Sequence, residues 1–220
     1  MVELAGFLLQ IPIVLLSLSL HEAAHGYVAF QMGDPTARNL GRLTLNPIKH
    51  LDLVGTLCML LAGYGWAKPV PINTRNFNNP KKGMALTALA GPASNLMLAL
   101  IFNILRAFFI VIAFYIIPQN ESTSLLVMIL NTFFYWGVYL NVSLAVFNLI
   151  PIPPFDGSRI FLSFLPPKTY FGIMKYERYI LLVTLILLYL GVFTGPISFI
   201  TRGIIGLFDK MLNVILGIVI

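Results

Sequence analysis

Residues 4–32 read LAGFLLQIPIVLLSLSLHEAAHGYVAFQM, an apolar segment in which His21, Glu22 and His25 stand close together. A hydrophobic stretch of this length predicts a transmembrane helix. Ionisable side chains inside such a helix are costly in lipid and mark functional sites. The segment therefore predicts both a membrane protein and a polar site in its first helix.

The spacing of the two histidines predicts a metal site. Positions four residues apart lie on one face of a helix, so His21 and His25 can bind the same ion. Zn2+ binds neutral imidazole at about 2.0–2.1 Å, and a catalytic zinc keeps one position open beside three protein ligands. Glu22 stands where the glutamate of an H-E-x-x-H helix acts as a general base on water. The alternatives are hydrogen-bonded polar residues of a helix bundle, or part of a signal sequence.

Composition indicates the class of protein. Of the 220 residues, 58% are hydrophobic and 10% are charged, against roughly 45–50% and 25% in soluble domains. At about 20 residues per span, the length allows about six spans. We therefore predict an all-α polytopic membrane protein with about five to six transmembrane helices, in which residues 1–220 form a single domain. The net charge of +6 is expected at the cytoplasmic membrane surface rather than on nucleic acid.

The apolar segments after the first helix differ in length. Residues 83–117, 125–150 and 179–193 predict further spans, the last followed by an apolar tail. Residues 53–66 are too short for a comfortable span and contain three glycines. They favour a re-entrant or short extended element.

Lysine and arginine predict the orientation in the membrane. They cluster in residues 38–82 and 159–178, whereas the turn at residues 118–124 contains none. Basic residues mark the cytoplasmic side of membrane proteins. We therefore expect the end of the first helix that carries His25, together with Asp156, to face the cytoplasm.

Two histidines need a third protein ligand, and Asp156 is the first candidate. It follows a proline-rich turn at the end of a span, and Gly157 allows the backbone to turn sharply there. A carboxylate at that depth is costly unless it is paired or bound to a cation. An ordinary Asp-Gly turn is the alternative, and His50, in a basic loop, is the other candidate ligand. The remaining carboxylates are expected at the water boundary: Asp34, Asp52, Glu121, Glu177 and Asp209.

Three motifs stand out along the chain: His21-Glu22-x-x-His25, Gly91-Pro92-x-x-Asn95 and Asn148-x-x-Pro151-x-x-x-x-Asp156-Gly157. Together they resemble the signature motifs of the site-2 protease family, the intramembrane zinc metalloproteases. The resemblance implies that His21, His25 and Asp156 bind one Zn2+ per chain and that Glu22 is the base. It also implies that Asn148, with Asn95, holds the substrate backbone or the oxyanion. The compact prokaryotic members are similar, and no PDZ or CBS domain is expected.

The resemblance also implies an activity, the cleavage of transmembrane segments of membrane-anchored proteins. The expected partners are a membrane-protein substrate with a transmembrane helix and the lipid bilayer of the cell membrane, with no nucleic acid. Residues 69–73 favour an extended backbone that could offer a strand edge to an unwound substrate. A non-catalytic membrane scaffold and a metal transporter stay open. We expect a transporter to carry polar residues across the full membrane depth, whereas here they gather toward one side.

Two of the motifs, and Arg106 outside them, also have structural interpretations. Gly91 to Asn95 could start a helix, with small residues that allow close packing. Asn148 could cap the end of its helix. Arg106 is expected to extend toward the membrane surface or to pair with lipid phosphate rather than to act on substrate.

Overall fold

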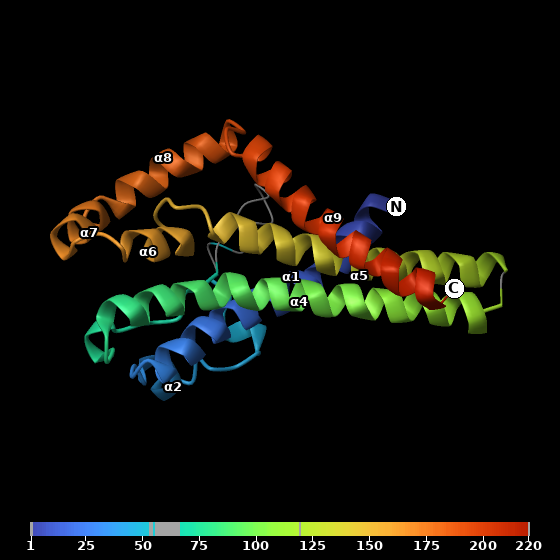
Figure 1. Cartoon of the computed structure of the whole chain (residues 1–220), viewed down its shortest axis with the longest axis horizontal. Helices are drawn as coiled ribbons and strands as arrows, with labels where there is room; N and C mark the ends of the chain where they lie inside the picture. Colours follow the sequence, from blue (N-terminus) through green and yellow to red (C-terminus); the bar gives the residue numbers. More distant parts are fainter. Residues whose placement is uncertain (1, 53–54, 56–66, 119, 220) are drawn as a thin grey trace.

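A computed structural model describes residues 2–52, 55, 67–118 and 120–219 (Figure 1). In chain order its helices and 3-10 turns are α1 (Val2–Gln31), α2 (Thr36–Asn39), η1 (Pro47–Lys49), η2 (Thr74–Asn76), α4 (Pro80–Ile116), α5 (Glu121–Asn148), α6 (Asp156–Leu162), α7 (Pro167–Met174), α8 (Glu177–Tyr189) and α9 (Thr194–Val219). Within the described residues, β-type pairing is limited to an isolated bridge between Leu51 and Ala67. The predicted all-α class is confirmed for this part of the chain.

Three helices, α1, α4 and α5, are long and apolar enough to cross a membrane. Helices α8 and α9 meet at an angle of 78° and add a fourth candidate if the bent pair counts as one span. The described residues thus contain three or four candidate spans, and the predicted number of five to six is not confirmed. The element predicted at residues 53–66 lies outside the described residues, Gly55 excepted.

The ends of the long helices follow from their flanking residues. Helix α1 ends just before Gly33, whose φ of 110° suits glycine, and Pro35 cannot continue the helix. Helix α4 begins at Pro80, and the side chain of Asn79 accepts a hydrogen bond from the backbone N–H of Lys82. The 37 residues of α4, at about 1.5 Å each, exceed a hydrocarbon core of about 30 Å. A membrane span of this length would have to tilt or project beyond the lipid.

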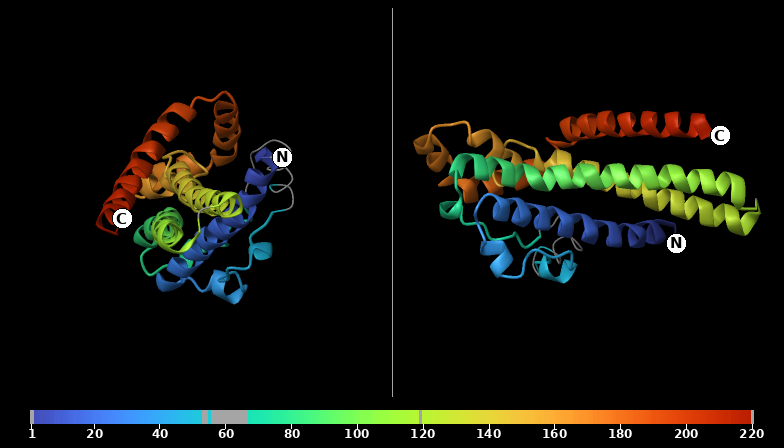
Figure 2. Two further views of the ribbon diagram at one scale, coloured as in Figure 1. Left: turned by 90° about the vertical axis from the view of Figure 1, so that its right-hand side faces the viewer. Right: turned by 60° about the horizontal axis from the view of Figure 1, so that its bottom comes forward.

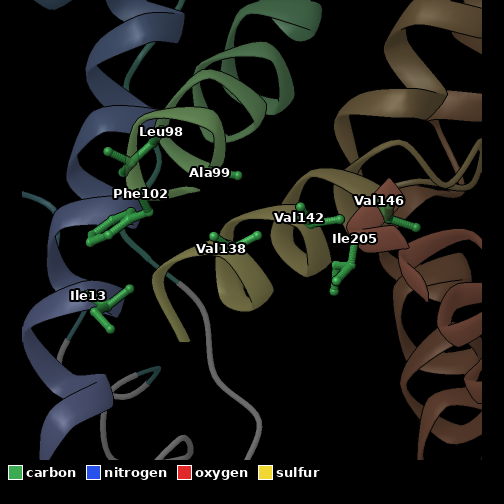
Figure 3. Close-up of a cluster of buried hydrophobic side chains, with 8 residues drawn as sticks. All are labelled: Ile13, Leu98, Ala99, Phe102, Val138, Val142, Val146 and Ile205. Atoms are coloured by element: carbon green, nitrogen blue, oxygen red, sulfur yellow. The ribbon is translucent and has the colours of Figure 1, made fainter. Parts of the chain in front are cut away.

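Helix α4 is the centre of the bundle. It packs against α1 and α5, and it also contacts α6 and α9 (Figure 2). A Cβ atom on Gly137 of α5 would overlap the ring of Phe102 on α4, so this glycine lets the two helices approach closely. The apolar core lies where α1, α4, α5 and α9 meet (Figure 3) and consists of Ile13, Leu98, Ala99, Phe102, Val138, Val142, Val146 and Ile205.

Polar contacts attach α9 to α4. The side-chain amide of Asn103 donates to the main-chain oxygen of Phe208 over 3.0 Å. Arg106 Nη1 lies 3.5 Å from Asp209 Oδ1, and Arg106 Nε donates to Asn131 Oδ1 over 2.9 Å. The prediction that Arg106 extends to the surface or to lipid phosphate is wrong, because α5 and α9 provide protein partners for its guanidinium.

The connection after α1 is organised by Asp34. This side chain is fully buried and accepts hydrogen bonds from the backbone N–H and hydroxyl of Thr36, the amide of Asn76 and the backbone N–H of Asn73. Burial raises the pKa of Asp34, but these hydrogen bonds outweigh burial and lower it below its ordinary value. The expectation of a solvated carboxylate is wrong here, since protein donors replace water. Asp34 thereby joins the end of α1 to residues 73–76.

Candidate metal centre

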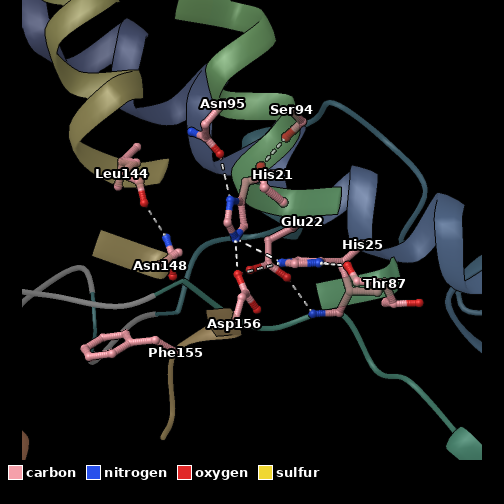
Figure 4. Close-up of polar contacts among 12 residues, drawn as sticks. His21, Glu22, His25, Thr87, Ser94, Asn95, Leu144, Asn148, Phe155 and Asp156 are labelled. Atoms are coloured by element: carbon pink, nitrogen blue, oxygen red, sulfur yellow. Dashed lines mark hydrogen bonds and ion pairs between the residues drawn. The ribbon is translucent and has the colours of Figure 1, made fainter. Parts of the chain in front are cut away.

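His21 and His25 project from the same face of α1, as their spacing predicts (Figure 4). Their rings meet edge to face with centroids 4.5 Å apart, and their Nε2 atoms are 3.0 Å apart. Both residues are buried, with 6% and 7% of their surface exposed. The pair forms two thirds of a possible ion site inside the bundle.

Asp156 completes the group from a distant part of the chain. It is the first residue of α6, and its Oδ2 lies 3.1 Å from His21 Nε2 and 3.2 Å from His25 Nε2. A Cβ atom on Gly157 would overlap the main-chain oxygen of Leu149, so glycine lets α6 start this close to the end of α5. The structure thus brings the three predicted ligands together as a possible metal-binding group.

His50, the other candidate ligand, lies elsewhere. It is 1% exposed, and its Nε2 is 2.8 Å from the main-chain oxygen of Thr44. Its own main-chain oxygen accepts a hydrogen bond from the N–H of Lys68. His50 therefore holds together the loops that follow α1, and the group around Asp156 forms without it.

Hydrogen bonds on the outer edge of each ring decide which nitrogen carries the proton. His25 Nδ1 lies 2.7 Å from the main-chain oxygen of Thr87, which can only accept, so Nδ1 is the donor. His21 Nδ1 lies 2.7 Å from Asn95 Oδ1 and donates for the same reason. In the neutral rings, both Nε2 atoms then carry lone pairs toward Asp156, which is the tautomer that binds metal.

Three acceptor atoms therefore converge on one point. Among the described residues, Asp156 Oδ2 is buried and has no hydrogen-bond partner. Such a group is stable only with positive charge at its centre. Burial raises the pKa of Asp156, but its pairing with the two imidazoles outweighs burial and lowers the pKa below its ordinary value. A divalent cation serves all three atoms at once, and two imidazoles with one carboxylate suit Zn2+.

Glu22 lies beside this group (Figure 4). Its Oε2 accepts a hydrogen bond from the backbone N–H of Val70 over 2.7 Å. Val70 belongs to residues 69–73, the segment predicted to be extended, which follows Lys68 and its bond to His50. The contact places Val70 of this segment beside the predicted base, and residues 69–73 form no strand.

Gly91 lets α4 pass directly over the two imidazoles. A Cβ atom at Gly91 would overlap ring atoms of both His21 and His25. Because α4 begins at Pro80, residues 91–95 lie inside the helix, and the interpretation that they start a helix is wrong. The interpretation that small residues allow close packing is supported, and the packing partners are the two rings.

Asn95 and Asn148, both predicted to support substrate, have different surroundings. Asn95 is 1% exposed; its oxygen faces His21, and its amide donates to Asn141 Oδ1 over 3.1 Å. Asn148 is the last residue of α5, and its amide donates back to the main-chain oxygen of Leu144 over 3.0 Å. Asn95 is therefore placed to orient a histidine, whereas Asn148 stands where the chain turns toward Asp156.

Two supporting residues, Asn141 and Asp34, were not predicted from the sequence. The available signal for Asn141 is an amide inside an apolar span, where polar side chains hydrogen-bond between helices. The signal for Asp34 is the Asp-Pro-Thr sequence after a helix, because an aspartate commonly accepts from the backbone two residues on.

Comparisons with known proteins agree with this geometry. Residues 9–191 match the sequence model of Peptidase family M50. The chain is 42% identical over 174 residues to the Bacillus subtilis protein named "Putative zinc metalloprotease YwhC", a match that covers 79% of this chain and 77% of that protein. It is 32% identical over 193 residues to Rip2 of Mycolicibacterium smegmatis, which carries the same description, with 83% and 67% covered. No solved structure matches the chain significantly. The chain therefore belongs to peptidase family M50, the site-2 protease family.

Proposed function

We propose that this chain is a zinc-dependent endopeptidase that cleaves transmembrane segments of membrane-anchored proteins. The observation that carries the proposal is the convergence of His21 Nε2, His25 Nε2 and Asp156 Oδ2 within 3.2 Å of one another, among apolar helices. Family membership supports the reaction class. The description of the similar proteins as zinc metalloproteases supports the choice of metal.

The proposed chemistry assigns a role to each side chain. The two histidines and Asp156 would hold a zinc ion, which would supply a Lewis acid to polarise a carbonyl and acidify water. Glu22 takes the proton of the attacking water and passes it to the leaving amine. The bond from Val70 occupies Oε2 and leaves Oε1 as the proton acceptor. Asn95 is 1% exposed and both of its polar groups are bonded inside the protein. Asn148 is only half-buried, and its amide has a second hydrogen besides the one donated to Leu144, so we assign support of the oxyanion to Asn148.

Substrate delivery needs a backbone partner near Glu22. The amides of a transmembrane helix are protected by its own hydrogen bonds, so the helix must unwind before it is cut. Val70, in the segment of residues 69–73, bonds to Glu22, which supports a role of this segment as the edge that receives the unwound substrate. Cleavage that continues unchanged after replacement of residues 69–73 would reject this part of the proposal.

We also propose a multi-pass protein of the cell membrane with its site toward the cytoplasm. The basic residues of the segments 38–82 and 159–178 support this orientation, because they flank the end of α1 that carries His25 and the helix that starts at Asp156. The candidate spans α1, α4 and α5, with the α8–α9 pair, support more than one crossing.

A metal transporter is a weaker alternative, although the expectation that polar residues gather toward one side is wrong. Polar residues do not gather on one side alone, since Asn103, Arg106, Asn131 and Asp209 meet at another level of the bundle. The core residues Leu98, Phe102 and Val138 lie between that level and the histidines. Among the described residues, these two polar groups are therefore separated by apolar side chains and do not form one polar path.

Replacement of Glu22 by glutamine tests the proposal. The Glu22→Gln variant keeps the metal ligands but removes the base, so we expect zinc content to stay at that of the wild type while cleavage is lost. The measurement is mass spectrometry of membrane fragments that accumulate in cells, with metal analysis of the purified protein. Glu177→Gln on α8 is the matched control and should behave as wild type. Unchanged fragments in the Glu22→Gln cells would favour a scaffold or a transporter.

A further inference from the structure

Three buried amide and imidazole groups form a continuous relay across α1, α4 and α5. Asn141 Nδ2 donates to the main-chain oxygen of Gly137 over 2.8 Å. Asn141 Oδ1 accepts from Asn95 Nδ2 over 3.1 Å, and Asn95 Oδ1 faces His21 Nδ1 at 2.7 Å. Asn95 and Asn141 are 1% and 0% exposed, so solvent cannot replace either partner.

The direction of the relay is set at its far end. The oxygen of Gly137 can only accept, so the amide nitrogen of Asn141 must point to it and the oxygen of Asn141 must point to Asn95. That oxygen selects the amide nitrogen of Asn95, which leaves the oxygen of Asn95 for His21. An acceptor at this place requires a proton on His21 Nδ1 and therefore a lone pair on Nε2.

The two histidines differ in how this state is secured. His25 donates to the main-chain oxygen of Thr87, which is always an acceptor and cannot exchange places with a donor. His21 donates to a side-chain amide that could turn over and present its nitrogen instead. With Asn95 turned over, the favoured tautomer of His21 would carry its proton on Nε2, and that nitrogen could no longer be a metal ligand.

We propose that Asn141 is a positioning residue of the metal site, which acts through Asn95 to hold His21 in the metal-binding tautomer. The helix packing suits this role, because Gly137, which ends the relay, is also where α5 approaches Phe102 of α4 closely. The consequence for catalysis rests on the proposed function, whereas the effect of Asn141 on the tautomer of His21 is independent of it.

The direct test is nitrogen-15 NMR of the histidine side chains in the full-length, metal-free protein in detergent micelles. The chain contains three histidines, so His25 and His50 serve as internal references. In the wild type, His21 should show the tautomer protonated at Nδ1. In Asn141→Leu, His21 should shift to a mixture or to the tautomer protonated at Nε2, while His25 keeps the signal it has in the wild type.

Two further variants make the test decisive. Asn141→Ser keeps a donor for Gly137 but is too short to reach Asn95, so it should change His21 in the same direction with little change in packing. Asn103→Leu removes a second buried amide, of equal exposure to Asn95, that bonds to Phe208 instead. It should leave the His21 signals unchanged. A His21 tautomer that stays as in the wild type in Asn141→Ser, or that changes equally in Asn103→Leu, would overturn the proposal.

Zinc affinity gives a second measurement that does not depend on activity. Loss of a residue that orients a metal ligand typically weakens metal binding by about 10- to 100-fold. We expect this range for both Asn141 variants in competition with a chelator, and no change for Asn103→Leu. If the wild type cut no membrane substrate, the proposed function would fail while the tautomer and zinc measurements would still decide the role of Asn141.

Discussion

Helix α4 contributes residues to two polar groups at different levels of the bundle, and the two groups differ in whether they need an added cation. The metal-side group consists of His21, His25, Asn95, Asn141 and Asp156. The α9-side group consists of Asn103, Arg106, Asn131 and Asp209. Each contains one aspartate, so the surroundings of the two carboxylates can be compared directly.

The carboxylate of Asp156 faces acceptors, whereas that of Asp209 faces a cation. Asp156 Oδ2 lies 3.1 and 3.2 Å from two imidazole nitrogens that carry lone pairs. Asp209 Oδ1 lies 3.5 Å from the guanidinium of Arg106, and its side chain is 46% exposed. The first arrangement needs an added cation, and the second already contains one. A buried carboxylate thus indicates a metal only when its neighbours cannot supply hydrogens or charge.

Asp34 is a third case that completes the comparison. It is as buried as the metal-side group, but its neighbours are all donors. Hydrogen bonds to a carboxylate compensate for lost hydration, so this site is satisfied without a cation. Asp34 therefore serves structure, although burial alone would have made it a candidate ligand.

The largest expected effect comes from removing the aspartate of the metal-side group, and the aspartate of the α9-side group provides the control. Asp156→Ala should abolish stoichiometric zinc and cleavage, because two imidazoles alone leave the site one ligand short. Asp209→Ala should keep both. Metal analysis of the purified variants checks the difference. Equal zinc content in the two variants would contradict the claim that only the metal-side group binds a cation.

A smaller effect is expected from filling the space over the imidazoles. Gly91→Ala places a methyl group against both rings, and overpacking of this kind costs about 1–3 kcal/mol. If that strain falls on the ligands, zinc affinity drops by about 5- to 150-fold. Gly203→Ala on α9 is the control, since a Cβ there meets nothing within 4 Å. Chelator competition that gives the same zinc affinity for both variants would show that α4 yields without disturbing the rings.

The pH dependence of stability should show how much the charge of Asp34 contributes. Its pKa is lowered in the folded protein, so its stabilising contribution is present above the unfolded pKa of about 3.9 and is lost as pH falls toward the lowered value. Asp34→Asn cannot accept all the hydrogen bonds and should lose about 2–3 kcal/mol at neutral pH. Thermal unfolding of the metal-free proteins should show that the difference in stability between wild type and Asp34→Asn becomes smaller below about pH 4. A difference in stability that stays constant down to pH 3 would show that the charge of Asp34 does not contribute to stability.

The smallest effect is expected in the α9-side group. Arg106→Met removes the cation beside Asp209, and a partly exposed ion pair contributes about 1 kcal/mol or less. The variant should unfold at a slightly lower temperature and hold α9 less firmly against α4, where the Asn103–Phe208 hydrogen bond stays, with unchanged zinc affinity. Limited proteolysis at the turn between α8 and α9 measures the second effect. A fall in zinc affinity would mean that the two polar groups are coupled through the core.

Much of the candidate site was open to prediction because its signals are local. Helical periodicity puts His21 and His25 on one face, and Glu22 follows from its position beside them. Asp156 was a candidate from its depth and from the family motif rather than from any contact that the sequence shows. The prediction for Arg106 failed because its partner Asp209 lies on another helix, and a contact between distant helices leaves no local signal in the sequence.

The sequence by itself determined the membrane class, the all-α character and the histidine pair, because hydropathy and helical spacing are properties of neighbouring residues. The tertiary structure alone decided which edge of each imidazole carries the proton, whether an aspartate faces donors or acceptors, and where Asn141 acts. His21 and Asn95 are 74 positions apart, and Asn95 and Asn141 are 46 apart. Hydrogen bonds over such separations depend on how helices pack, which no local pattern of residues specifies.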